Sequence, residues 1–183
     1  MISLVGRAED YLKRYEAWDF AFSATSARHE IKLAHEQAKL RADISKVATF
    51  PVIVARYADA KKMSFVRRSD IAVISQQGPA TPDHVIRTKR LPMLGRDVVR
   101  YSGVYKKYFA TYNLQAKESK TMLDPAPRVV LDEELGLCAI GKTVKDSGIV
   151  ADIYDHTIDI ILRATALGGY EALPAKDIFD VEY

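Results

Sequence analysis

The residues whose types and spacing suit chemistry lie in residues 78–92, which read GPATPDHVIRTKRLP. One glycine and three prolines stiffen this segment. Thr81 followed by Pro82 is typical of a helix N-cap with proline at the first helical position. The free backbone N–H groups and the positive dipole end of such a helix start attract anions. The segment therefore predicts a rigid corner able to hold a phosphate or carboxylate.

Basic side chains follow the expected helix start within a few residues. Arg87, Lys89 and Arg90 could neutralise an anion, and His84 could donate or accept a proton near neutral pH. The alternative is a proline-stiffened connection that carries only solvated charges. Spacing alone favours this alternative, because short motifs give many false positives.

A well-patterned helix is predicted directly after the corner, over residues 97–113. Its apolar positions step by three or four residues, and most of them are tyrosines: Val98, Tyr101, Tyr105, Tyr108 and Tyr112. Tyrosine joins an apolar ring to a hydroxyl, so this stripe could line a pocket or a subunit interface. A half-buried packing face explains the stripe equally well and is the simpler interpretation.

A β-hairpin is predicted over residues 128–140, where two short apolar runs flank the sequence DEELG. Gly136 and the following Gly141-Lys142-Thr143 satisfy the literal spacing of a phosphate-binding loop. The apolar, strand-like residues 137–140 between them cannot wrap a phosphate, so we discount nucleotide binding there. Thr143 with Asp146 instead predicts a capping box at the start of a helix.

That helix is expected to run over residues 144–167 and to end at Gly168-Gly169. One of its faces carries residues that could be taken for a metal cluster: Asp152, Asp155, His156 and Asp159. A solvated charged face explains these side chains with fewer assumptions.

The rest of the chain predicts further helices over residues 1–15, 27–42 and 70–77. His29 and His35 lie six residues apart on the second of these, so they do not share a face and are interpreted as surface residues. Residues 44–58 fit either a buried strand or a helix that starts near Pro51, and we favour the helix. The final residues, 173–183, resemble a linker.

Composition limits the classes of function. The 183 residues suffice for one domain of ordinary size, and 48% hydrophobic with 28% charged residues is typical of a globular chain. The net charge is only +3, from 27 basic and 24 acidic residues that interleave, so we expect no nucleic-acid partner. No apolar run reaches the ~18 residues of a membrane span, and no signal peptide is recognisable. Cys138 is the single cysteine, which indicates a buried inert thiol and a reducing, cytoplasmic setting.

Three phrases of the sequence resemble one family. These are GPATPDHVIRTKRLP, RVVLDEELGLCAIGKTVKD and ALGGYEALPAKDIFDVEY. They are similar to the middle of bifunctional proteins of the rhamnulose-1-phosphate aldolase/alcohol dehydrogenase type, which join a class II aldolase module to a short-chain dehydrogenase. The resemblance covers residues 65–183. In addition, MISLVGRAEDYL resembles the last helix of the family's first aldolase module, so we expect the chain to be an interior piece.

The resemblance implies a fold and a division of the chain. Residues 128–169 are similar to the closing hairpin and helix of an aldolase/adducin-type domain, which implies a degenerate, helix-rich α/β/α domain with a short sheet. A complete Rossmann fold is not expected, because its glycine-rich fingerprint is absent. We expect a helical lead-in over residues 1–42, an aldolase-like middle domain over 43–172, and a linker toward a dehydrogenase domain over 173–183.

The family's zinc-binding His-x-His pair is also absent. The resemblance therefore implies zinc and NAD(P) in other modules of the parent protein, with no metal or cofactor in this chain. Residues that match the family phrase are taken as site candidates. His84 is the candidate catalytic residue, and the candidate substrate- or anion-binding residues are Thr81, Asp83, Arg87, Thr88 and Lys89.

Two functions of different class follow. In the first, the chain completes a site for a small sugar phosphate within a bifunctional aldolase/dehydrogenase of deoxy-sugar catabolism. In the second, it is a non-catalytic module that spaces two catalytic domains and drives homo-oligomer formation through the tyrosine helix. A free-standing aldolase-like enzyme is the least favoured reading, because no three-ligand metal set is visible in the sequence.

Overall fold

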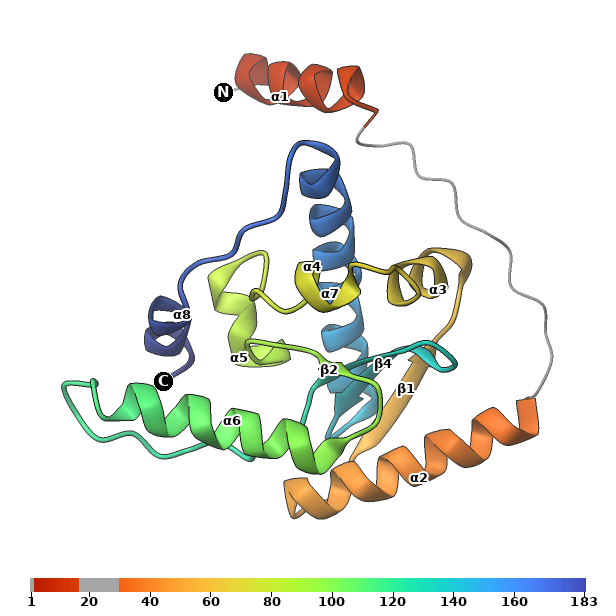
Figure 1. Cartoon of the computed structure of the whole chain (residues 1–183), viewed down its shortest axis with the longest axis vertical. Helices are drawn as coiled ribbons and strands as arrows, with labels where there is room; N and C mark the ends of the chain where they lie inside the picture. The colour runs from red at the N-terminus through yellow and green to blue at the C-terminus, as the bar shows by residue number, and fades with distance from the viewer. Residues whose placement is uncertain (1, 17–29) are drawn as a thin grey trace.

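A computed structural model describes residues 2–16 and 30–183, and its centre is a four-stranded sheet (Figure 1). The order of strands is β1-β4-β3-β2, with β4 antiparallel to both of its neighbours and β2 parallel to β3. The strands span Ile53–Tyr57 (β1), Met93–Leu94 (β2), Val129–Asp132 (β3) and Gly136–Gly141 (β4).

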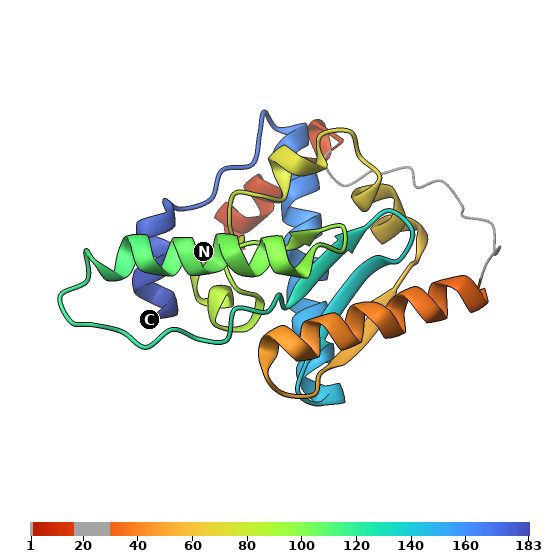
Figure 2. The same ribbon diagram turned by 60° about the horizontal axis from the view of Figure 1, so that its bottom comes forward.

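Helices cover both faces of the sheet and make three α/β/α layers. The helix α7 packs on one face together with α3 and α4, whereas α2 and α6 pack on the opposite face (Figures 1 and 2). This arrangement agrees with the expected helix-rich mixed fold. The helices just named span Glu30–Ala48 (α2), Ala60–Val66 (α3), Ile71–Ile74 (α4), Val98–Asn113 (α6) and Val144–Ala166 (α7).

Strand β4 explains the uninterrupted apolar run around the cysteine. Leu137 and Ala139 face the core under α7, while Cys138 and Ile140 face the core under α2 and α6. A strand covered on both faces has no polar side and therefore reads as a continuous hydrophobic stretch. Cys138 is buried as expected, and burial raises the pKa of its thiol to about 12, which favours the protonated, unreactive form.

The predicted hairpin and the capping box are both confirmed. Strands β3 and β4 pair from Val129 opposite Ala139 to Asp132 opposite Gly136, which leaves a three-residue connection. In the capping box, the Asp146 N–H donates to Thr143 Oγ1 at 3.1 Å and the Thr143 N–H donates to the Asp146 carboxylate at 3.1 Å. Gly141 therefore ends a strand and Thr143 begins a helix, with no loop between them that could wrap a phosphate.

Residues 44–58 do not form the helix near Pro51 that we favoured. Helix α2 continues to Ala48, Thr49 turns the chain with a φ of 66°, and residues 53–57 form the edge strand β1. The strand forms because Ile53–Tyr57 pairs along the whole of β4, a partner far away in the sequence that local periodicity does not reveal. The domain boundary expected at residue 43 falls within α2. The expected start of this helix at residue 27 and His29 lie outside the described residues.

The last residues form a helix, α8 (Ala175–Glu182), where we expected a linker. Ile178 and Phe179 are almost completely buried, and Phe179 packs against the tyrosine side of α6. Both views place α8 beside the end of α6, next to the C-terminus (Figures 1 and 2).

The helix predicted over residues 1–15 is confirmed as α1 (Ile2–Arg14). Among the described residues, no helix combines the length and the apolar character that crossing a bilayer requires.

Candidate functional site

The corner at residues 78–92 contains the expected helix start, but the helical turn that follows is short. Thr81 occupies the N-cap and Pro82 the first position of a helical turn, η1 (Pro82–His84), followed by the short helix α5 (Val85–Thr88). The Thr81 side chain makes no capping hydrogen bond. The helix start is therefore one 3₁₀ turn, which aligns few backbone dipoles for an anion.

The first residue of the corner, Gly78, contacts the C-terminal part of the chain. The Tyr170 hydroxyl donates a hydrogen bond to the Gly78 carbonyl at 2.9 Å. A Cβ atom at Gly78 would lie 2.7 Å from Ile178 Cδ1 and 3.1 Å from Ala172 Cβ, so a larger residue would force these side chains to shift. Residues 170 and 178 thus hold the corner against the body of the domain.

Lys89 ends α5 with a φ of 60° and points inward, with only 4% of its surface exposed. Its ammonium group donates to the Asp124 carbonyl and lies 3.6 Å from the centre of the Tyr105 ring. Burial lowers the pKa of Lys89 to about 8, although the charges of Asp124 and Glu182 act against this shift. The side chain that we expected to face an anion is instead buried between the Asp124 carbonyl and the Tyr105 ring.

Tyr105 joins this lysine to the C-terminus. Its hydroxyl donates to Glu182 Oε1 at 2.7 Å and shares a 2.5 Å hydrogen bond with the Tyr183 hydroxyl. Burial raises the pKa of Glu182, against the opposing effects of the Tyr105 hydrogen bond and the Lys89 charge. We call this group the Lys89 cluster, and its members are Lys89, Tyr105, Tyr108, Glu182 and Tyr183.

The six candidate site residues do not converge. Asp83 and Arg87 are exposed, and the buried Thr88 hydroxyl donates to the His84 carbonyl at 3.0 Å. No hydrogen bond or ion pair joins the side chains of any two of the six, all of which lie in the described part of the chain. His84 is half-buried, and its Nδ1 atom is buried without a hydrogen-bond partner.

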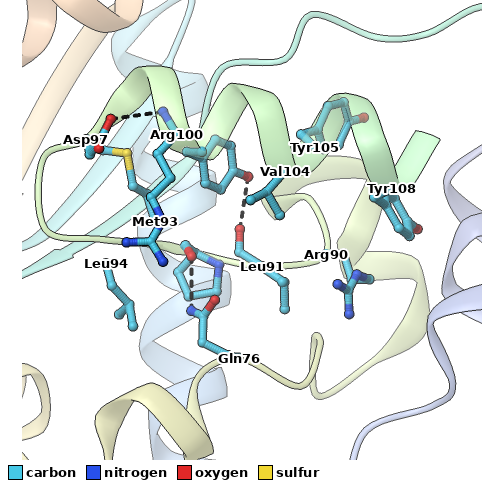
Figure 3. Close-up of a pocket in the computed structure, with 12 residues that line it drawn as sticks. Gln76, Arg90, Leu91, Met93, Leu94, Asp97, Arg100, Val104, Tyr105 and Tyr108 are labelled. Carbon is cyan, nitrogen blue, oxygen red and sulfur yellow. Dashed lines mark hydrogen bonds between the residues drawn. The ribbon is translucent and has the colours of Figure 1, made fainter. Parts of the chain in front are cut away.

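A pocket lies between α6 and residues 90–94, and we call it the α6 pocket (Figure 3). Its volume is about 270 Å³. The Tyr101 hydroxyl donates to the Leu91 carbonyl at 3.0 Å, and the Gln76 amide donates to the Pro92 carbonyl at 3.1 Å. These two bonds fix one wall of the pocket.

Sequence reasoning found only part of this pocket. The tyrosine stripe suggested a pocket as one alternative, and Tyr101, Tyr105 and Tyr108 do line it. Arg90 was recognised as part of the basic corner, but Arg100 was not singled out. Sequence periodicity places Arg100 on the polar side of α6, and only the fold shows that it borders the pocket.

The acidic face of α7 is engaged in ion pairs. Asp155 lies 2.8 Å from the Lys61 ammonium and 2.7 Å from that of Lys62, and Asp159 lies 3.0 Å from Lys61. The charges thus fasten α7 to α3. The donor set for a zinc ion is not met in residues 2–16 and 30–183, where no three His, Cys, Asp or Glu side chains gather in metal-binding geometry.

Comparison with known proteins places these features in a family. The family model for the second domain of class II aldolases matches residues 31–183. The chain is 28% identical over 158 residues to the uncharacterized oxidoreductase YuxG of Bacillus subtilis (strain 168), covering 73% of this chain and 23% of that protein. The chain thus spans less than a quarter of this relative. No solved structure matches the chain. Because the matched region takes in the whole sheet and most of the helices, the chain belongs to the family of class II aldolase second domains.

Proposed function

We propose that this chain is a supporting domain of a bifunctional enzyme of the rhamnulose-1-phosphate aldolase/alcohol dehydrogenase type, which acts in deoxy-sugar catabolism. The family membership and the oxidoreductase name of YuxG support the two activities at a general level. The three sequence phrases that resemble this bifunctional type support the specific assignment. Zinc and NAD(P) belong, in this proposal, to the other modules of the enzyme.

The observation that carries the supporting role is the Lys89 cluster. The Tyr105 hydroxyl on α6 hydrogen-bonds to Glu182 on α8 and to Tyr183, and the Lys89 ammonium of the corner lies against the Tyr105 ring. Phe179 adds ring contacts to Tyr108 and Tyr112 on α6, with centroids 5.7 and 5.8 Å apart. These contacts hold the corner, α6 and α8 in one fixed arrangement. A domain needs such rigidity if it is to orient the modules of a homo-oligomer.

The test uses the full-length protein, with aldol cleavage of a ketose 1-phosphate and NAD(P)-dependent alcohol oxidation assayed separately. Phe179→Ala removes a ring that is 1% exposed, and Val181→Ala, at a 40% exposed site on the same helix, is the control. We expect Phe179→Ala to lower both rates and to shift the oligomer distribution in light scattering, and Val181→Ala to do neither. Unchanged rates and an unchanged oligomer in a Phe179→Ala protein that has lost its α8 packing would contradict the supporting role.

A second candidate function is contact with a phosphate-bearing substrate at His84, Arg87 and the neighbouring corner residues. The buried His84 Nδ1 atom without a partner favours it, because a buried nitrogen normally has a hydrogen-bond partner. His84→Ala separates the two functions. A loss of one activity beyond about tenfold, with the circular dichroism unchanged, supports substrate contact, whereas a change within about twofold in both supports the scaffold.

A further inference from the structure

We propose that the α6 pocket binds a small organic anion, a phosphate or carboxylate with an apolar body. This inference goes beyond the supporting role and does not depend on it, because it concerns a cavity that the Lys89 cluster does not fill. The pocket combines an apolar lining with two arginines (Figure 3).

The apolar part of the site comes from Leu91, Pro92, Met93 and Leu94 on one side and from Val104 on the other. The backbone of the first side is held by three features: the Tyr101 bond to Leu91, the Gln76 bond to Pro92, and the pairing of β2 with β3. The lining is therefore formed before a ligand arrives, which reduces the entropic cost of binding. A volume of about 270 Å³ lies just below the ~300 Å³ at which ordinary ligand pockets begin, so the ligand body is expected to be about one ring in size.

The charge of the site comes from Arg90 and Arg100. In Figure 3, the Arg100 side chain extends from α6 toward the opening above Gln76, and Arg90 lies at the other end beside Tyr108. Among the described residues, the Arg100 guanidinium has no hydrogen bond and no ion pair. Arg90 donates only a long 3.5 Å bond to the Gln77 carbonyl, and its guanidinium carbon lies 5.0 Å from the centre of the Tyr108 ring.

The carboxylates nearby leave this positive charge in place. Asp97 also lines the pocket, and one of its oxygens accepts the Arg100 backbone N–H at 2.9 Å as the cap of α6. Glu182 lowers the charge felt near Arg90 but forms no salt bridge with it. Arg96, close by in sequence, is different: it pairs with Glu36 at 2.8 Å, Asp132 at 2.8 Å and Glu134 at 2.7 Å.

Two guanidinium groups with few protein partners at an apolar cavity indicate an anionic ligand. Guanidinium binds phosphate and carboxylate through paired N–H donors. An apolar body would cover residues 91–94 and Val104, while the anionic group would meet Arg100 or Arg90.

Isothermal titration tests this site with four probes on the whole chain: phenyl phosphate, benzoate, inorganic phosphate and benzyl alcohol. We expect saturable binding of phenyl phosphate or benzoate, and at least about tenfold weaker binding of the inorganic ion and of the neutral alcohol, because each lacks half of the recognition. A tighter complex with phenyl phosphate assigns the site to phosphates, and a tighter one with benzoate assigns it to carboxylates. No saturation by either aromatic anion, or equal binding of benzyl alcohol, would overturn the proposal.

Two exposed valines on α6 provide a matched pair of variants. Val104 lines the pocket and is 52% exposed, whereas Val99 is 78% exposed and does not line it. Val104→Glu introduces a negative charge at the ligand site, and we expect it to weaken anion binding by at least about tenfold. Val99→Glu should change binding by less than about twofold, and Arg100→Gln should act like Val104→Glu. Equal effects of the two glutamates, with melting temperatures unchanged, would show that the anion binds elsewhere.

Discussion

Lys89 combines two features that are rare in one residue, a left-handed backbone and a buried ammonium group. The φ of 60° turns the chain at the end of α5 and directs the side chain under the Tyr105 ring. A non-glycine residue in this conformation is strained. The corner is basic in sequence, but one of its cations is buried inside the domain and does not face solvent.

Titration of Lys89 gives a prediction for stability. Its pKa is about 8 in the folded domain and near 10.5 in an unfolded chain, so the unfolded state binds more protons between these pH values. The free energy of unfolding should therefore rise with pH across this window. We expect a gain of roughly 1–3 kcal/mol between pH 7 and 9.5 in urea melts, and Lys89→Met should remove it. The control is Lys107→Met, which replaces an exposed lysine on α6. If plots of unfolding free energy against pH were parallel for the wild type and Lys89→Met, the pH dependence could not be assigned to Lys89.

Two glycines predict opposite effects of the same substitution. Gly136 has a φ of 80°, and a Cβ there would lie 2.5 Å from the Tyr57 carbonyl oxygen, so Gly136→Ala should cost more than about 1 kcal/mol. Gly148 lies within α7 with no atom near the position of an added Cβ, so Gly148→Ala should stabilise the domain by about 0.5–1 kcal/mol. Thermal melting of both variants checks this, and a Gly136→Ala domain that melts no lower than the wild type would show that glycine is not required at this turn.

At the scale of elements, α7 shows how far local sequence rules reach. The capping box, the apolar stripe and the glycines after the helix predicted α7 nearly to the residue, because all of these signals are local. The hairpin was predicted for the same reason. Strand β1 could not be found in this way, since it forms only where β4 provides a partner.

The cap of α7 is open to a direct test. Thr143→Ala removes a side chain that accepts from the Asp146 N–H, and losses of this kind typically cost about 1 kcal/mol. Chemical denaturation should show this loss without a change in slope. Lys145→Ala, at an exposed position of the same first turn, should have almost no effect. Equal stability of the two variants would mean that the cap contributes nothing.

The candidate site shows the limit of the same rules. Thr81 and Pro82 predicted the start of η1 correctly, but Lys89 and Arg100 could not be oriented from the sequence. Whether a basic side chain points inward or outward depends on what packs beside it, and Lys89 points inward to the Asp124 carbonyl and the Tyr105 ring. The sequence predicted a linker in the place of α8, because its apolar positions are few and their partners lie on α6 and in the corner.

For the whole molecule, the central claim is that α6, α8 and the corner form one unit. The claim explains why Gly78, Lys89, Tyr105 and Glu182, spread over about a hundred residues of sequence, are all buried together. It also separates two roles. The Lys89 cluster maintains the arrangement, and the α6 pocket, which shares Tyr105 and Tyr108 with this cluster, is the proposed ligand site.

Amide hydrogen exchange at residues 78–92 tests this claim most directly. In the wild type, the Lys89 N–H, which donates to Val85 O at 2.9 Å, should exchange far more slowly than in an unfolded peptide. Phe179→Ala, which should cost about 3–5 kcal/mol, should remove more protection from the corner than from the middle of α7. A corner that exchanges freely in the wild type, or that keeps its protection when α8 is loosened, would contradict the account.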